Sequence, residues 1–337
     1  MKLCIDKIRE ITTGAARIEE CEGGIRFYRY TKAQDEAYRV RNPEFWQRSH
    51  CTTGIKFCFD TDSEELFLKL DVVHKTSRTF FYVDVIKNGE IIGCIDNVGD
   101  ADTSGNYIAL QCQGGEFSKS FSLGKGEKRI CVRLPWAMIT TLKELSLDDG
   151  AFVKGVKSDK TLLAFGDSIT QGYDALHPSD RYISRLADAL GADEYNKAIG
   201  GDIFFPGLAA LKEDFEPDII TVAYGTNDWS HLGEEEFKIN CRGFYKNLSE
   251  NYPDVRIFAI TPIWRADCKE YRAFGSFERV VEDIKDATKD LRNVTVIEGI
   301  DFVPHDPSFF SDKYLHPNSK GFDHYFNNLL SEIKKYL

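Results

Sequence analysis

The sequence of 337 residues contains no apolar stretch long enough to cross a membrane. No run reaches about 18 consecutive apolar residues, the length that a transmembrane helix requires. The first residues, Met1-Lys2-Leu3-Cys4-Ile5-Asp6-Lys7, also lack the apolar core of a secretion signal. Together these absences predict a cytoplasmic protein without a membrane partner.

Cysteine patterns that bind metals or form disulfide frameworks are missing too. The nine cysteines are an odd number and include no CxxC pair. Without a secretion signal, such a scattered set is typical of reduced thiols that pack as small apolar side chains. Zinc-ligand spacings, a P-loop and a GxGxxG motif are also absent, so we expect neither a metal nor an organic cofactor.

Positively charged residues are fewer than negatively charged ones. The 43 Lys and Arg residues are outnumbered by 54 Asp and Glu residues, which leaves a net charge of −11. An acidic surface repels phosphate backbones, so nucleic acid is not an expected partner, whereas a neutral small-molecule substrate is unaffected. The length suits two domains, and nothing in the sequence indicates an oligomeric state.

The first domain, expected over residues 1–157, shows a period of two. Apolar residues alternate with others at Ile55, Phe57 and Phe59, and similar runs lie near residues 66–70, 81–85 and 130–134. Such alternation indicates half-buried strands, and Asn88-Gly89 between two of them is a hairpin-turn signal. Few helical patterns occur here. We therefore predict an antiparallel β-sandwich of jelly-roll type.

The second domain, expected over residues 158–337, alternates short apolar strands with amphipathic helices. The expected strands are 161–165, 194–199, 218–224, 255–261 and 294–297. The expected helices lie near 180–190, 203–213, 234–250, 270–291 and 318–335. This order predicts a parallel sheet that is covered by helices on both faces.

Candidate site residues follow three of these strands, at the sheet edge where α/β proteins bind ligands. Ser168 comes after the first strand, Gly201 after the second and Asn227 after the third. Taken singly, each has a structural explanation: a helix cap, a flexible loop and an Asx turn. His316 lies in the last loop, just before the final helix, where it could act as a general base with the upstream carboxylate of Asp312.

In this order, Ser168, Gly201, Asn227 and His316 resemble the four motif blocks of the SGNH (GDSL-like) hydrolase superfamily. The resemblance covers roughly residues 160–337. It implies a flavodoxin-like α/β/α sandwich with strand order 2-1-3-4-5. It also implies that Ser168 is the nucleophile, that Ser168, Gly201 and Asn227 form the oxyanion hole, and that His316 and Asp312 complete the triad.

The spacing of the acid departs from the family. The aspartate usually lies three residues before the histidine, whereas Asp312 lies four before. If Asp312 orients His316, residues 311–316 must form a compact turn, which we expect to be helical with Ser311 as its cap and the carboxylate on Nδ1. The alternative is a Ser-His dyad with a backbone carbonyl on Nδ1.

The two-domain arrangement resembles carbohydrate esterase family 2, which implies an acetyl esterase acting on O-acetylated oligosaccharides. Asp167, Trp229 and Trp264 are the residues we expect to contact the sugar. Part of the β domain is expected to wall the site. Two alternatives stay open: a thioesterase or lysophospholipase on the same scaffold, and a carbohydrate-binding protein whose hydrolase domain is inactive.

Overall fold

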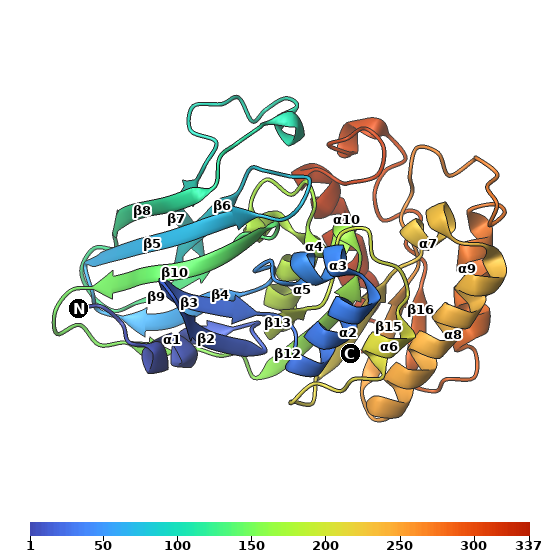
Figure 1. The fold of residues 1–337 in the computed structure, drawn as a ribbon, viewed down its shortest axis with the longest axis horizontal. Coiled ribbons are helices and arrows are strands. Elements are labelled where there is room, and N and C mark those ends of the chain that lie inside the picture. The colour runs from blue at the N-terminus through green and yellow to red at the C-terminus, as the bar shows by residue number, and fades with distance from the viewer.

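The computed structural model describes residues 1–337 as a β-sandwich followed by an α/β domain (Figure 1). The sandwich strands are β1 (Thr12–Thr13), β2 (Arg17–Cys21), β3 (Gly24–Tyr28), β4 (Lys56–Thr61), β5 (Glu65–His74), β6 (Tyr82–Lys87), β7 (Glu90–Asp96), β8 (Gly115–Ser122), β9 (Lys128–Arg133), β10 (Met138–Leu147) and β11 (Lys154–Gly155). They form two antiparallel sheets, of order β1-β4-β9-β6-β7 with β11 beside β4, and of order β2-β3-β10-β5-β8.

The sandwich core is built by the period-two pattern of its strands. Phe57 and Phe59 of β4 and Leu66, Leu68 and Leu70 of β5 are all fully buried. They belong to one apolar cluster between the two sheets. Asn88 and Gly89 both have positive φ at the β6–β7 turn, which confirms the hairpin expected from their sequence. The antiparallel sandwich predicted from the sequence is therefore present.

One expectation about the cysteines is wrong. Cys58 on β4 and Cys131 on β9 face each other as register partners, with their Cα atoms 4.2 Å apart, and their sulfur atoms form a disulfide. Seventy-three residues separate the two, so their pairing depends on strand register, which the sequence does not display. The other seven cysteines are free thiols.

Three helices in the first 50 residues were not expected. They are α1 (Ile5–Ile11), α2 (Lys32–Arg41) and α3 (Pro43–Ser49). Thr31 caps α2 in a capping box with Gln34, and Asn42 caps α3 ahead of Pro43. Although they precede most of the sandwich in the chain, α2 and α3 lie against the α/β domain (Figure 1). Tyr30 and Tyr38 belong to the apolar core of that domain.

The α/β domain contains a five-stranded parallel sheet of order β13-β12-β14-β15-β16, which confirms the expected 2-1-3-4-5 topology. Its strands are β12 (Lys160–Gly166), β13 (Ala192–Asn196), β14 (Ile219–Ala223), β15 (Arg256–Ile260) and β16 (Val294–Ile297). Its helices are α4 (Ser168–Gln171), α5 (Tyr182–Leu190), α6 (Pro206–Ala209), α7 (Thr226–His231), α8 (Glu234–Asn251), α9 (Glu278–Thr288) and α10 (Ser319–Ile333), with 3-10 turns η2 (Pro178–Asp180) and η3 (Pro307–Phe309). A further 3-10 turn, η1 (Tyr107–Ala109), lies in the sandwich between β7 and β8.

Both faces of this sheet are buried, as the continuous apolar strands indicated. Leu163 and Phe165 of β12 pack in the cluster that includes α8 and α9, whereas Leu162 and Ala164 pack in the cluster that includes α5 and α10. Two helices are shorter than expected, because only 206–209 of 203–213 and 278–288 of 270–291 are α-helical. No helix of the structure combines the length and apolarity needed to cross a membrane.

Candidate active site

Ser168 stands at the carboxyl end of β12, as the first residue of α4. The strand ends at Gly166, and the carboxylate of Asp167 then caps α4 by accepting the N–H of Ile169 at 2.9 Å. Ser168 is only 4% exposed, so its hydroxyl is held in a narrow space. The N–H of the first helical residue has no partner within its own helix, which leaves that of Ser168 free to face a ligand.

Ser168, His316 and Asp312 form a continuous hydrogen-bonded chain. The Oγ of Ser168 lies 2.9 Å from Nε2 of His316, and Nδ1 of His316 lies 2.7 Å from Oδ2 of Asp312. An ionised carboxylate only accepts, so Nδ1 carries the proton and donates it. Nε2 of the neutral ring is then the acceptor for the Ser168 hydroxyl, which is the arrangement a general base needs.

The turn that brings Asp312 to His316 is compact but not helical, so that expectation is wrong. Oδ1 of Asp312 accepts the backbone N–H groups of Tyr314, Leu315 and His316 at 2.9, 2.8 and 3.1 Å. Lys313 adopts a left-handed φ of 61°, and the loop closes where Ser311 N–H donates to the His316 carbonyl. The carboxylate therefore folds the backbone around itself, and Ser311 caps no helix.

The same contacts keep Asp312 ionised. Burial alone would raise the pKa of its carboxyl, but the His316 hydrogen bond and the backbone N–H groups hold this pKa well below its usual range. One oxygen of Asp312 thus fixes the turn while the other fixes the imidazole.

Two further groups that resemble oxyanion-hole donors lie in the loops that follow β13 and β14, the strands on either side of β12. Gly201 has a left-handed φ of 85°, and its N–H has no acceptor within the chain. Asn227 in the first turn of α7 is 8% exposed and donates one amide hydrogen to the carbonyl of Asp202 at 3.0 Å, which leaves the second hydrogen free. Because β12 lies between β13 and β14, the loops that follow these three strands meet at one edge of the sheet.

A second carboxylate also approaches His316. Asp174 is fully buried, has a left-handed φ of 70°, and places Oδ2 3.9 Å from Nδ1. Both of its oxygens pair with Arg78 of the sandwich, at 2.6 and 3.0 Å. Asp174, Asp312 and His316 are close enough to one another to hold a metal ion. Their arginine, histidine and peptide partners, however, already account for the cluster.

Residues 164–324 match the family model of the GDSL-like Lipase/Acylhydrolase family, which spans the strand-end serine and the histidine loop. The α/β domain is a GDSL-like lipase/acylhydrolase domain. The superfamily resemblance drawn from the sequence is thereby confirmed. No curated protein sequence matches the chain significantly.

Solved structures share the whole two-domain fold, that is, the sandwich together with the GDSL-like domain. The salicylyl-acyltransferase SsfX3 from a tetracycline biosynthetic pathway has a TM-score of 0.81 and 21% identity, covering 96% of this chain and 94% of its own. A family two carbohydrate esterase from Cellvibrio japonicus has a TM-score of 0.64 and 17% identity, covering 97% and 95%. A family two carbohydrate esterase from Clostridium thermocellum, in complex with cellohexaose, has a TM-score of 0.65 and 13% identity, covering 96% and 98%.

Two of the three residues expected to contact the sugar, Asp167 and Trp229, are buried. Asp167 is 2% exposed, its carboxylate serves as a helix cap, and burial raises its pKa to about 7. Trp229 is fully buried, and its Nε1 donates to the carbonyl of Gly275. Trp264 is half-buried with one ring face stacked on His305. The assignments of Asp167 and Trp229 are therefore corrected, because packing in the GDSL-like domain takes up both side chains.

Several residues that shape the site were missed by sequence reasoning. Tyr173 lies with its ring centroid 5.5 Å from that of His316. Tyr107 of the sandwich donates its hydroxyl hydrogen to the backbone carbonyl of Asp174 or to the hydroxyl of Ser311. Arg78 and Arg48 reach the site from other parts of the sandwich domain. Tyr107, Arg78 and Arg48 belong to the other domain, and Tyr173 lies beyond α4 outside any short motif, so the sequence carried no signal for them.

Proposed function

We propose that the protein is a serine esterase that hydrolyses short acyl esters, with acetylated oligosaccharides as its substrate class. The observation that carries the proposal is the chain from Asp312 through His316 to Ser168, with distances of 2.7 and 2.9 Å. A serine, an oriented imidazole and an ionised carboxylate in this order form the arrangement that activates a serine for acyl transfer.

The reaction runs in two halves. As Oγ of Ser168 bonds to the ester carbonyl carbon, its proton moves to Nε2 of His316, and the oxyanion is held by the N–H groups of Ser168 and Gly201 and by the Asn227 amide. The carbon–oxygen bond to the alcohol then breaks, and the alcohol leaves with the proton from His316. In the second half His316 takes a proton from water as its oxygen attacks the acyl carbon. The bond from this carbon to Oγ then breaks, the acid leaves, and His316 returns the proton to Oγ of Ser168.

A short acyl group is supported by the crowding around Ser168. A side chain at Gly200 would collide with the ring of Tyr173 at 2.8 Å, and one at Gly201 would lie 3.3 Å from Nη1 of Arg48. The Tyr173 ring also lies beside His316, with centroids 5.5 Å apart, so we expect a long acyl chain to find little room. We expect acetyl esters to react fastest, and a steep fall in rate toward longer chains to distinguish this enzyme from a lysophospholipase.

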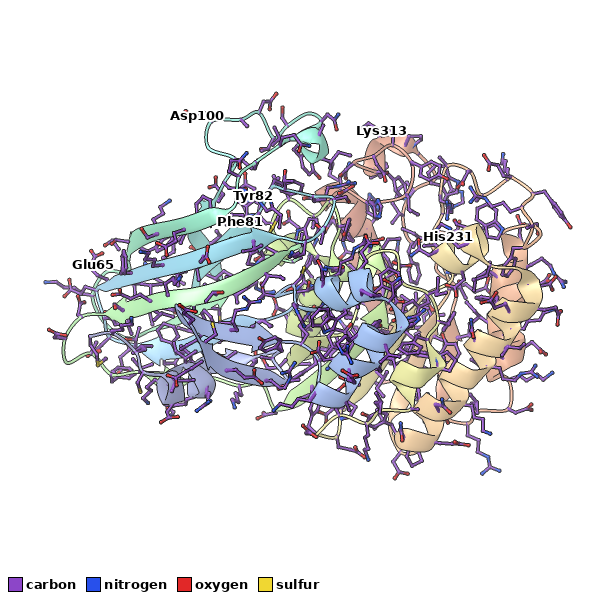
Figure 2. All side chains as sticks on the ribbon, viewed as in Figure 1. Glu65, Phe81, Tyr82, Asp100, His231 and Lys313 are labelled. Atoms are coloured by element: carbon purple, nitrogen blue, oxygen red, sulfur yellow. A yellow bond between two sulfur atoms is a disulfide. The ribbon has the colours of Figure 1, made fainter.

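The sugar substrate is supported by a groove that has Asp312 among its lining residues and is here called the Asp312 groove. It has a volume of about 890 Å³ and separates a sandwich loop from the loop that carries His316. In Figure 2, Asp100 marks the sandwich loop and Lys313 marks the loop that carries His316. Most of the lining residues have polar side chains; the lining consists of Thr103, Ser104, Gly105, Asn106, Tyr107, Ile108, Leu176, Ser308, Ser311, Asp312, Lys313, Asn318, Ser319 and Lys320. Hydroxyl, amide and ammonium groups are suited to the hydroxyls of a sugar chain. Two of the similar structures are named as carbohydrate esterases.

The first experiment tests the reaction class. Wild-type protein and Ser168→Ala are incubated with a fluorophosphonate probe and with p-nitrophenyl acetate. We expect labelling and hydrolysis of the wild type only, with activity of the variant lower by at least about 10³-fold, the usual scale for loss of a triad member. An unlabelled, inactive wild type would favour a binding protein with an inactive hydrolase domain.

The second experiment tests the substrate class with acetylated xylo-, gluco- and manno-oligosaccharides, with release of acetate as the readout. Asn106→Ala should raise KM for the oligosaccharides and leave p-nitrophenyl acetate unaffected, because Asn106 lines the Asp312 groove and not the serine. Gln111→Ala is the matched control, since Gln111 is exposed in the same segment but does not line the groove. Equal kinetics of all three proteins on every oligosaccharide would contradict the assigned groove.

Acyl transfer to an alcohol is a second candidate. Of the three solved structures described above, the one with the highest TM-score, 0.81 over 96% of this chain, is named as an acyltransferase. The acyl-serine formed by Ser168 would then react with a hydroxyl instead of water. Product analysis with added alcohols or sugars separates the two, because a transferase forms new ester and a hydrolase forms free acid.

A further inference from the structure

The loop that carries Gly201 is held from outside the GDSL-like domain. This loop, residues 196–202, follows β13 and is here called the oxyanion loop. Side chains from residues 29–48 bind it along its whole length: Arg29 donates to the carbonyls of Asn196 and Ala198, Tyr30 to the carbonyl of Lys197, Arg48 to the carbonyl of Gly200, and Tyr38 and Arg41 to the carboxylate of Asp202. The segment around α2 and α3 thus acts as a template for this loop (Figure 1).

Arg48 makes the contact nearest to the chemistry. Its Nη1 lies 2.6 Å from the carbonyl oxygen of Gly200, and the next peptide N–H belongs to Gly201. In a trans peptide the C=O and N–H bonds point in opposite directions. A donor that fixes the Gly200 carbonyl on one side therefore directs the Gly201 N–H to the other side.

The Gly200–Gly201 unit needs such support, because neither glycine has a side chain and Gly201 has a left-handed φ of 85°. On its other side, the N–H of Gly200 donates to Oε1 of Gln171 at 2.6 Å. Gln171 ends α4, the short helix that begins with Ser168. Gln171 of α4 therefore holds the preceding Ile199–Gly200 peptide, and the Arg48 guanidinium holds the Gly200–Gly201 peptide itself.

We propose that Arg48 is a positioning residue for ester hydrolysis, acting through the Gly200–Gly201 peptide to aim and strengthen the Gly201 N–H of the oxyanion hole. This inference rests on the proposed esterase function. A charged donor on the carbonyl draws electron density toward oxygen, which makes the N–H of the same peptide a stronger donor. Arg48 itself is held in place by an ion pair with Glu44, one turn earlier in α3.

The test compares Arg48→Met with the wild type on p-nitrophenyl acetate. The Gly201 N–H acts on charge that develops in the transition state, so kcat should fall by about tenfold while KM stays within about twofold. Loss of a complete oxyanion donor costs about 10²–10³-fold, and the smaller value reflects a donor that is misaligned but still present. Binding of an alkyl boronic acid, which forms a tetrahedral adduct on the serine, should weaken by the same factor as kcat/KM.

Two control variants separate positioning from folding. Arg48→Lys keeps a charged donor and should recover part of the lost kcat. Arg39→Met removes an arginine from neighbouring α2 that pairs only with Glu36, and it should match the wild type in kcat and in boronic acid affinity. Thermal melting of each variant reports its folding. If folded Arg48→Met keeps wild-type kcat, the proposal is wrong. If Arg48→Met does not fold, Arg48→Gln removes the charge in its place, and folded Arg48→Gln with wild-type kcat and boronic acid affinity overturns the proposal. A wild type without hydrolysis or probe labelling would instead overturn the esterase function itself.

Discussion

The Asp312 side chain performs two tasks with its two oxygens. Oδ1 accepts three backbone N–H groups and shapes the turn, while Oδ2 accepts the proton-bearing Nδ1 of His316. A spacing of four residues is therefore compatible with a triad, because the carboxylate draws the chain into a turn tighter than an extended strand allows. Of the two arrangements weighed from the sequence, this geometry is that of a triad.

Asp312→Asn should separate the two tasks. The carbonyl oxygen of asparagine can still accept the backbone N–H groups, so we expect the turn and the melting temperature to be preserved. The amide nitrogen would face Nδ1 and favour the wrong tautomer of His316, which in a triad costs up to about 10⁴-fold in kcat. The measurement is steady-state kinetics with a melting curve. Activity within about tenfold of the wild type would support a Ser-His dyad.

Asn227 offers a second prediction at this scale. Asn227→Ala removes a donor that we assign to the oxyanion, so kcat should fall by about 10²–10³-fold with little change in KM. The variant also loses the hydrogen bond to the Asp202 carbonyl, so its stability is measured in parallel. A change confined to KM would show that the amide binds the ground-state substrate instead.

At the scale of single elements, α10 begins directly after the turn that carries His316. Asn318 is its N-cap: Oδ1 accepts the N–H of Gly321 at 3.0 Å, and Nδ2 donates to the carbonyl of Ser308 at 2.8 Å. The cap therefore joins the helix to the far side of the His316 loop. A buried face of α10, including Phe322 and Leu329, anchors this arrangement to the sheet.

Asn318→Ala should destabilise the protein by about 1 kcal/mol, the usual cost of losing an N-cap. Asn318→Ser or Asn318→Asp should recover most of the loss, because both can accept the Gly321 N–H. The midpoint of urea unfolding measures the effect. A stability of Asn318→Ala equal to that of the wild type would mean that the buried face alone fixes the start of the helix.

The elements differ in how well the sequence predicts them. Strands β12, β14, β15 and β16 are short, mainly apolar runs, and their order gave the topology and the strand-end positions of Ser168 and Asn227. Strand β13 (Ala192–Asn196) is mainly polar, and it begins two residues before the strand expected at 194–199. Helices α2 and α3 were missed because their side chains pack on a domain that begins more than a hundred residues later. The turn at Asp312 was misjudged as helical because contacts between its side chain and backbone leave no periodic pattern.

At the scale of the whole molecule, the two domains are joined by buried polar contacts as well as by the chain. Trp136 of the sandwich donates to the carbonyl of Ala175, and Gln171 donates back to the carbonyl of Trp136. His177, in the loop after α4, places Nδ1 2.7 Å from the buried carboxylate of Asp84 on β6. Such long-range pairs are invisible in a sequence, because each partner is an ordinary residue in its own segment.

The His177–Asp84 contact should make stability depend on pH. Burial alone would lower the pKa of His177, but the hydrogen bond and charge of Asp84 raise it above the ordinary value of 6.5. A raised folded-state pKa means that this stabilisation is fully present below about pH 6.5 and is lost as the pH rises through the folded-state value. The difference in unfolding free energy between wild type and His177→Gln should therefore be larger at pH 6 than at pH 9.

Urea unfolding at the two pH values measures this difference, since contributions of other groups are common to both proteins. Asp84→Asn should reduce the pH dependence in the same way, because it removes the charge that favours protonated His177. If the difference in unfolding free energy between wild type and His177→Gln is equal at both pH values, the His177 ring stays neutral in the folded protein at both, and the prediction is wrong.

The position of α2 and α3 also bears on how the protein is made. Arg48 and its acceptor, Gly200, are 152 residues apart, and at about 5–20 residues per second a ribosome needs roughly 8–30 seconds to add that length. During that interval Tyr30 and Tyr38 have none of the later-synthesised neighbours that bury them in the finished molecule. A nascent or truncated chain that stops after the sandwich would present this apolar surface, which is a target for chaperones and proteases.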